Sequence, residues 1–313
     1  MNNNVSSVGS LVPDFDLAHA PQITVPVKSL YSGSTSQLGM FAELDTIRVV
    51  TGVAGADNVV NAKVRGRIND GDVVDYAPGG QLNVELVATE HPAVLLTAGL
   101  DEPAYPKLRD AGIAVLPDAE WLEATPLGRA EWIKVIAALT GTEKKATEVY
   151  GHLRNDYEVL VDQVAGIPPA QVLLGTQYQG SWSMPTGSDY AGRLVLDAGG
   201  GYPWADNDTA GHLQLNFESV YAKAGQAPTW LVDTDWETLA DAVAADPRYG
   251  TLAAVRDGQV WSADKALGPA GGNDYWERGV ARPDLVLADL TAILHPALLP
   301  DHHFEFYRRI PRP

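Results

Sequence analysis

One long helical segment between two strand-and-helix halves is the feature that most restricts how this chain can fold. Apolar residues recur at steps of three and four from Ala146 to Val164, the period of a helix buried along one face. Thr142 is placed to cap its start, and Gly166, with two prolines after it, stops it. At about 1.5 Å per residue, the segment 142–166 predicts a stiff rod of roughly 35 Å that joins two lobes.

Strand patterns alternate with helical patterns on both sides of this rod. Such alternation predicts βαβ units and mostly parallel sheets. We therefore expect an α/β protein with two Rossmann-like lobes, connected by a single long rigid helix, and a ligand cleft between the lobes. The expected division is a flexible N-terminal arm over 1–21, an N-terminal α/β lobe over 22–141, the linking helix over 142–166 and a C-terminal α/β lobe over 167–313.

The charge balance and the missing residue types exclude several function classes. The 22 Lys and Arg residues against 40 Asp and Glu residues give a formal net charge of −18, which disfavours general nucleic-acid binding and docking on anionic membranes. The chain has no cysteine, and therefore no thiol nucleophile, disulfide or iron–sulfur cluster. The His residues are scattered, and only His302 and His303 are adjacent, in a tail where we expect solvent exposure rather than a metal site.

Enzyme signatures are also missing. The nucleotide-binding, nucleophile-elbow and zinc-protease motifs do not occur, so we expect no enzyme. Asp and Glu are plentiful, and a carboxylate pair of the kind that glycosidases use stays open on composition alone. The first residues, from Met1 to Ser7, are polar and uncharged, without the pattern of a signal peptide. A mature protein whose signal peptide has been removed, with a flexible tether at its start, fits this sequence.

Two short segments repeat a pattern at corresponding places in the two halves. The residues Asn-Val-Glu at 83–85 open a helical pattern that precedes Pro92 and a strand, and Asn-Phe-Glu at 216–218 precede Pro228 and a strand. Such helix openings are common, because Asn caps the helix and Glu suits its first turn. The repeated pattern is therefore open to two interpretations, a coincidence or a sign that the two lobes are related.

These segments, with three others in the same order, resemble one known family. The other segments are Asp197-Ala198-Gly199-Gly200, the stretch from Asp246-Pro247-Arg248 to Trp261, and Arg282-Pro283-Asp284-Leu285 with His295-Pro296. From about residue 22 to residue 300, the chain resembles the substrate-binding proteins of ABC importers for ferric siderophores, cobalamin and haem. It departs from them after its first strand, where Tyr31-Ser32-Gly33-Ser34-Thr35 replaces a Pro-containing turn.

The resemblance implies a solute-binding component that captures an iron–siderophore complex between its lobes. It would deliver this complex to an ABC permease and ATPase at the membrane, as an extracytoplasmic monomer in the periplasm or as a cell-surface lipoprotein. No covalently bound cofactor, metal site or nucleic-acid partner is implied. Cobalamin or haem is the alternative ligand within the family. A two-lobed α/β hydrolase or transferase that uses cleft carboxylates is the alternative of a different class.

The resemblance also assigns roles to individual residues. Glu85 and Glu218 resemble the exposed pair that docks on arginines of the permease, and a solvated Glu in a first helical turn is the simpler reading. Aromatic and hydroxyl side chains on Gly- and Ser-rich loops after strands suit a large, flat ligand. Arg278 suits an anionic siderophore or a propionate, and an ion pair with a nearby Asp is its alternative. The predicted ligand-binding residues are Tyr31, Ser32, Ser34, Tyr76, Tyr178, Trp182, Tyr275, Trp276 and Arg278.

Overall fold

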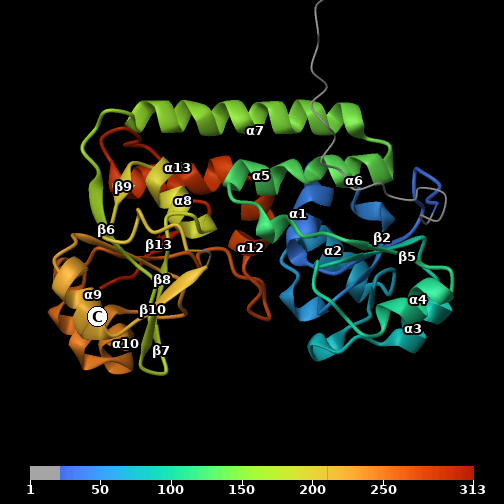
Figure 1. Cartoon of the computed structure of the whole chain (residues 1–313), viewed down its shortest axis with the longest axis horizontal. Helices are drawn as coiled ribbons and strands as arrows, with labels where there is room; N and C mark the ends of the chain where they lie inside the picture. Colours follow the sequence, from blue (N-terminus) through green and yellow to red (C-terminus); the bar gives the residue numbers. More distant parts are fainter. Residues whose placement is uncertain (1–21, 210) are drawn as a thin grey trace, which may run out of the picture.

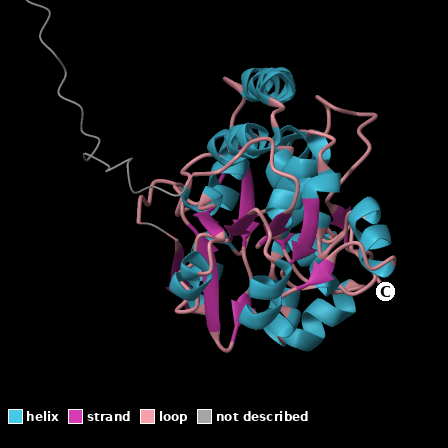
Figure 2. Ribbon diagram, turned by 90° about the vertical axis from the view of Figure 1, so that its right-hand side faces the viewer, coloured by secondary structure: helices cyan, strands magenta, loops and turns pink. Residues whose placement is uncertain are grey.

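The computed structural model describes residues 22–209 and 211–313 (Figure 1). The predicted flexible arm over 1–21 lies outside the described residues. Two groups of strands and helices lie side by side beneath one long helix, α7 (Glu143–Val164), which runs across both. In the view turned by 90°, the strands lie between helices on either side (Figure 2). Both main sheets are mostly parallel, so the α/β class that the sequence predicts is confirmed.

The N-terminal sheet is parallel throughout, with the strand order β3-β2-β1-β4-β5. Its strands are β1 (Leu30–Ser32), β2 (Val50–Val53), β3 (Val74–Asp75), β4 (Val94–Thr97) and β5 (Ala114–Pro117), and its helices are α1 (Thr35–Glu43), α2 (Ala62–Asn69), α3 (Val84–Glu90) and α4 (Tyr105–Asp110). The central strands β1 and β4 are buried over their whole length. Helices cover both faces of a parallel sheet, which explains why these strands are short apolar runs rather than alternating ones.

The C-terminal sheet has the order β13-β12-β11-β6-β9, and only its edge strand β13 pairs antiparallel among the strands described. Its strands are β6 (Ala170–Leu174), β9 (Gly200–Gly201), β11 (Thr229–Val232), β12 (Val260–Ser262) and β13 (Arg308–Arg309). The remaining helices of the chain are α5 (Pro126–Glu131), α6 (Ile133–Thr140), α8 (Tyr190–Asp197), α9 (Phe217–Ala224), α10 (Leu239–Ala245), α11 (Ala253–Asp257), α12 (Asp274–Ala281) and α13 (Pro283–Leu294).

A separate antiparallel sheet projects from this lobe on the side away from α7 (Figure 1). It consists of β7 (Gln177–Tyr178), β8 (Ser181–Pro185) and β10 (His212–Leu215). Gln179 and Gly180 both have positive φ and form the tight turn between β7 and β8, as a two-residue hairpin with the right twist requires. This hairpin stands where the sequence predicts a ligand loop after β6.

α7 is attached to both lobes along its length. Ala146, Tyr150 and Leu153 belong to the core of the N-terminal lobe, whereas Tyr157 belongs to the core of the C-terminal lobe. The apolar stripe therefore changes partner in the middle of the helix. Within the described residues no helix, α7 included, combines the length and the apolar character needed to cross a membrane.

α12 provides a second connection between the lobes. It packs on α1, and its Val280 is part of the N-terminal core, although the division predicted from the sequence places residues 167–313 in the C-terminal lobe. Gly39 permits this packing, because a Cβ at that position would lie 2.3 Å from the carbonyl oxygen of Glu277. The buried carboxylate of Glu277 accepts hydrogen bonds from the backbone N–H groups of Val60 (2.7 Å) and Asn61 (2.8 Å).

Candidate ligand site

A cavity of about 720 Å³ lies where the ends of β6 and β11 meet α8 and α12. A cavity of this size suits a bound small molecule. Most of its lining comes from the C-terminal lobe, and the segment from Trp121 to Ala124, which follows β5, completes it together with Arg129 of α5. The position at the carboxyl ends of parallel strands is where α/β sheets commonly bind ligands.

Aromatic side chains form part of the cavity wall. Trp121 and Trp276 line it and are 47% and 41% exposed, respectively. Each indole is held by its N–H group, which donates to the carbonyl oxygen of Ala98 (3.0 Å) from Trp121 and to Asp233 (3.2 Å) from Trp276. Exposed and fixed indole rings offer a large apolar surface at low cost in conformational entropy.

A buried ion pair lies at the floor of the cavity. The Nε atom of Arg129 is 2.6 Å from a carboxylate oxygen of Glu120, whose other oxygen accepts a hydrogen bond from Ser36 (2.8 Å). The guanidinium also lies 4.4 Å from the ring centre of Tyr190. Burial alone would lower the pKa of Arg129, but the hydrogen bond with Glu120, together with the electrostatic effects of Glu120, Tyr190 and Tyr275, outweighs it, and the pKa is raised. The arginine is therefore charged, and the carboxylate of Glu120 balances its charge.

The hydroxyl group of Tyr190, beside this ion pair, is a buried polar group without a partner in the part of the chain that the structure describes. The side chain is buried, lines the cavity, and has no hydrogen-bond partner for its hydroxyl among the described residues. Burial raises its pKa to about 12, so the phenol stays protonated and can donate. A buried polar group without a partner costs free energy, and a ligand in the cavity would supply that partner.

A hydrogen-bonded set of polar groups forms one side of the cavity. Asp189 caps α8, accepting from the backbone N–H of Ala191 (2.9 Å), and lies 3.5 Å from Nε2 of His212. Nδ1 of His212 is 2.7 Å from the hydroxyl of Ser183. Burial raises the pKa of Asp189, but hydrogen bonds from His212 and the α8 backbone outweigh it, so the pKa is lowered. The contact with Asp189 in turn raises the pKa of His212.

The ligand residues predicted in the N-terminal lobe do not line this cavity, which corrects their placement. Tyr31 and Tyr76 are buried and stacked with ring centres 5.0 Å apart. Tyr31 lies in the central strand β1 and packs against Gly52, where a Cβ would lie 2.6 Å from its ring. Ser32 is buried and donates to Gln37, and Ser34 caps α1. These hydroxyls satisfy backbone and core groups.

Of the ligand residues predicted in the C-terminal lobe, some line the cavity and others lie outside it. Tyr275 and Trp276 line the cavity. Trp182 is 0% exposed, stacks on Trp230 in the core, and donates its indole N–H to the carbonyl oxygen of Leu174 at 2.8 Å. Tyr178 is 74% exposed at the tip of the β7–β8 hairpin, outside the cavity lining. The turn at 179–180 sends the chain back, and the alternation of β8 then turns Trp182 inward.

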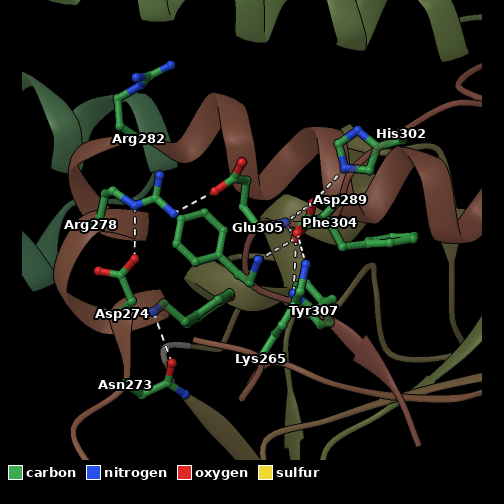
Figure 3. Close-up of polar contacts among 12 residues, drawn as sticks. Lys265, Asn273, Asp274, Arg278, Arg282, Asp289, His302, Phe304, Glu305 and Tyr307 are labelled. Atoms are coloured by element: carbon green, nitrogen blue, oxygen red, sulfur yellow. Dashed lines mark hydrogen bonds and ion pairs between the residues drawn. The ribbon is translucent and has the colours of Figure 1, made fainter. Parts of the chain in front are cut away.

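Arg278 is likewise outside the cavity lining, and its alternative reading, an ion pair, is the one observed (Figure 3). It bridges Asp274 (2.9 Å) and Glu305 (2.7 Å). In the same region, His302 lies 2.6 Å from the buried Asp289, which corrects the expected solvent exposure of this histidine. Among the described residues, no group of three or more His, Cys, Asp or Glu side chains could hold a metal ion.

The two predicted docking residues are both exposed. They lie in the first turns of α3 and α9, which are on the side of the molecule away from α7 (Figure 1). Glu218 pairs with Arg248 (2.9 Å), whose guanidinium lies over the ring of Phe217. Glu85 forms no ion pair with any residue that the structure describes. Trp121 lines the cavity but is not among the predicted ligand residues; its signal in the sequence is a Trp in the acidic stretch from Asp118 to Glu123 that follows a strand.

Comparison with known proteins relates this architecture to a group of binding proteins. Residues 31–267 match the family model described as periplasmic binding protein. An uncharacterized lipoprotein of Methanocaldococcus jannaschii is 26% identical over 76% of this chain, and the chain spans 56% of that protein's length.

Two solved structures show the same fold at low sequence identity. The periplasmic vitamin B12 binding protein of Vibrio cholerae has a TM-score of 0.61 and 16% identity, and the match covers 88% of this chain and 99% of that one. The triscatecholate siderophore binding protein of Bacillus subtilis has a TM-score of 0.63 and 17% identity, covering 88% of this chain and 95% of that one.

Proposed function

The chain belongs to the periplasmic binding protein family, and we propose that it is the solute-binding component of an ABC importer for an iron–siderophore complex. It would hold the chelate in the cavity and deliver it to the membrane permease and ATPase. Cobalamin or haem is the alternative ligand. The family is one of transport components without enzymatic activity, which favours binding over the hydrolase or transferase alternative.

The cavity of about 720 Å³, walled by Trp121, Trp276 and Tyr190, carries this proposal. Two exposed indoles and an unpartnered phenol suit a ligand that is large, rigid and partly apolar. α7 and α12 each join the lobes, so closure around the ligand would be small. The relatives are lipoproteins, which supports a place outside the cytoplasm and at the membrane surface.

A fluorescence titration tests the ligand class. We expect one chelate from a panel of ferric siderophores, cobalamin and haem to quench tryptophan fluorescence saturably at submicromolar concentration. Trp121→Ala combined with Trp276→Ala should weaken binding of that chelate at least about tenfold. Each indole that the ligand covers would contribute roughly a kcal/mol or more to the binding free energy.

Tyr178→Ala is the matched control, because this exposed aromatic lies outside the cavity lining. Its affinity should equal that of the wild type, measured by isothermal titration calorimetry. An unchanged affinity in the double tryptophan variant would move the site away from this cavity. Absence of binding across the panel would contradict the proposed function.

Charge reversal tests the docking surface. With Glu85→Arg and Glu218→Arg together, we expect ligand uptake by cells to fall about tenfold or more, since like charges would face the arginines of the permease. Ligand affinity should not change, because neither residue lines the cavity. Glu148→Arg on exposed α7 is the control and should support normal uptake. Wild-type uptake by the double variant would show that these two residues do not dock the permease.

A further inference from the structure

The charged side chains around the cavity are mostly acidic. Four carboxylates line it, namely Glu123, Asp189, Asp208 and Asp233, against one arginine, Arg129, and one histidine, His212. No lysine lines the cavity within the described part of the chain. A bound ligand therefore meets an excess of negative charge.

The single arginine in the lining is already paired with a buried carboxylate. Arg129 has its Nε 2.6 Å from Glu120, and both side chains are almost completely buried. The positive charge of Arg129 is therefore already balanced by the carboxylate of Glu120, and the pair adds little net positive charge to the cavity. Arg278, the residue that the sequence offered as an anion clamp, is held by Asp274 and Glu305 away from the cavity lining.

Asp189 is a fixed anionic anchor rather than a mobile surface carboxylate. The backbone N–H of Ala191 and the imidazole of His212 hold it in place, and its pKa is lowered, so it is ionised near neutral pH. The unpartnered hydroxyl of Tyr190, the next residue, independently indicates that a polar group of a ligand is missing from this side of the cavity.

We propose that the cavity selects a metal chelate that carries a net positive charge or a pendant ammonium group, and that it disfavours polyanionic chelates. The inference rests on the proposed function and narrows its ligand class. A ferric tris-hydroxamate is neutral around the iron, and a terminal ammonium makes it a cation. A ferric tris-catecholate has six phenolate oxygens on one ferric ion and is polyanionic, and haem carries two propionates.

The physical reason is that burying like charges against each other is costly, whereas opposite charges gain in a partly water-excluded cavity. The net charge of −18 acts in the same direction at long range, because it slows the approach of anions and favours that of cations. The indoles of Trp121 and Trp276 add to this preference, since aromatic faces attract cationic groups.

The central comparison is between two chelates that share one iron centre and differ at a terminal amine. Ferrioxamine B has a free ammonium group, and its N-acetyl derivative has the same iron centre without that charge. Both are titrated into the full chain by calorimetry at low and at physiological salt, beside a ferric tris-catecholate, cobalamin and haem. We expect ferrioxamine B to bind about tenfold more tightly than its N-acetyl form, with a difference that shrinks as salt is added.

Variants test which carboxylates produce the preference for the ammonium-bearing chelate. Asp189→Asn preserves a side chain that can cap α8, and Asp233→Asn changes an exposed residue, so thermal unfolding should show both proteins folded. Each variant should reduce the preference for ferrioxamine B over its N-acetyl form, and the double variant should abolish it. Glu148→Gln, an exposed carboxylate on α7, is the matched control and should keep the preference.

The outcomes separate this inference from the proposed function. Equal affinities for the two ferrioxamines, or a tris-catecholate, haem or the neutral cyano form of cobalamin that binds more tightly than ferrioxamine B, would overturn the charge selection while the chelate-binding function stands. Variants that keep the full preference would also overturn it. No binding by any chelate would overturn the proposed function and the inference together.

Discussion

The Asp289→Ala protein unfolds at a much lower urea concentration than the wild type, with an expected loss of about 3–5 kcal/mol in the free energy of unfolding. Asp289 is 0% exposed and lies in α13, against the C-terminal segment (Figure 3). Its carboxylate accepts from the backbone N–H groups of Glu305, Phe306 and Tyr307 at 2.7–3.1 Å, and from the ring of His302 at 2.6 Å.

Alanine would leave these donors buried without an acceptor, and each such group costs about 1–3 kcal/mol. The C-terminal segment also supplies β13 and the buried side chains of Phe306 and Tyr307, so its release would expose part of the core. Chemical denaturation followed by circular dichroism measures the effect. Asp301→Ala, an exposed neighbour, should change the free energy by less than about 0.5 kcal/mol. Equal stabilities for the two variants would contradict the anchoring role of Asp289.

The Gly39→Ala protein should lose about 2–3 kcal/mol of stability, although alanine is the better helix former. Its Cβ would lie 2.3 Å from the carbonyl oxygen of Glu277 and 3.2 Å from the Cα of Arg278. Backbone atoms cannot rotate away as a side chain can, so α12 would have to move off α1. That movement would also lengthen the hydrogen bonds from Val60 and Asn61 to Glu277.

Gly66→Ala provides a matched control in the same lobe. Gly66 lies inside α2, and a Cβ added there would have no neighbour within 4 Å, so alanine should stabilise the protein by about 0.5–1 kcal/mol through helix propensity alone. Differential scanning calorimetry of the two variants should therefore show shifts of the melting temperature in opposite directions. Two shifts of the same sign would mean that the approach of α12 to α1 does not depend on Gly39.

The sequence predicts the fold well because the strongest signals are local and periodic. The apolar stripe of α7 and the alternation of short apolar strands with amphipathic helices need only neighbouring residues to be recognised. The antiparallel hairpin at 177–185 was missed because its turn is only Gln179-Gly180, and aromatic residues beside Gly and Ser read as a loop. The hairpin changes the predicted site, because in β8, which pairs with β7 and β10, Trp182 is buried in the core instead of facing a ligand.

The ligand site is harder to predict because its members come from separate parts of the chain. Tyr275 and Trp276 are predicted correctly as lining residues, because two aromatic residues follow a Gly-rich polar stretch; the structure places both in the first turn of α12. For Arg278, the nearby Asp274 leaves the ligand role and the ion pair both open in the sequence; Glu305, which completes the bridge, is far along the chain and enters only with the C-terminal segment. Tyr31 looked accessible because the local sequence does not show that Tyr76 and Gly52 enclose it.

The packing of α12 on α1 has a consequence for how the chain is made. Synthesis proceeds from the N-terminus, and domains commonly fold as they emerge. Here the first lobe lacks Val280, Ala281 and the hydrogen-bond acceptor Glu277 until nearly the whole chain has left the ribosome. The Gly39 face of α1, which α12 covers in the finished protein, therefore stays exposed during that time. For the same reason, a fragment that ends at α7 would contain the N-terminal sheet but would lack part of that lobe's own core.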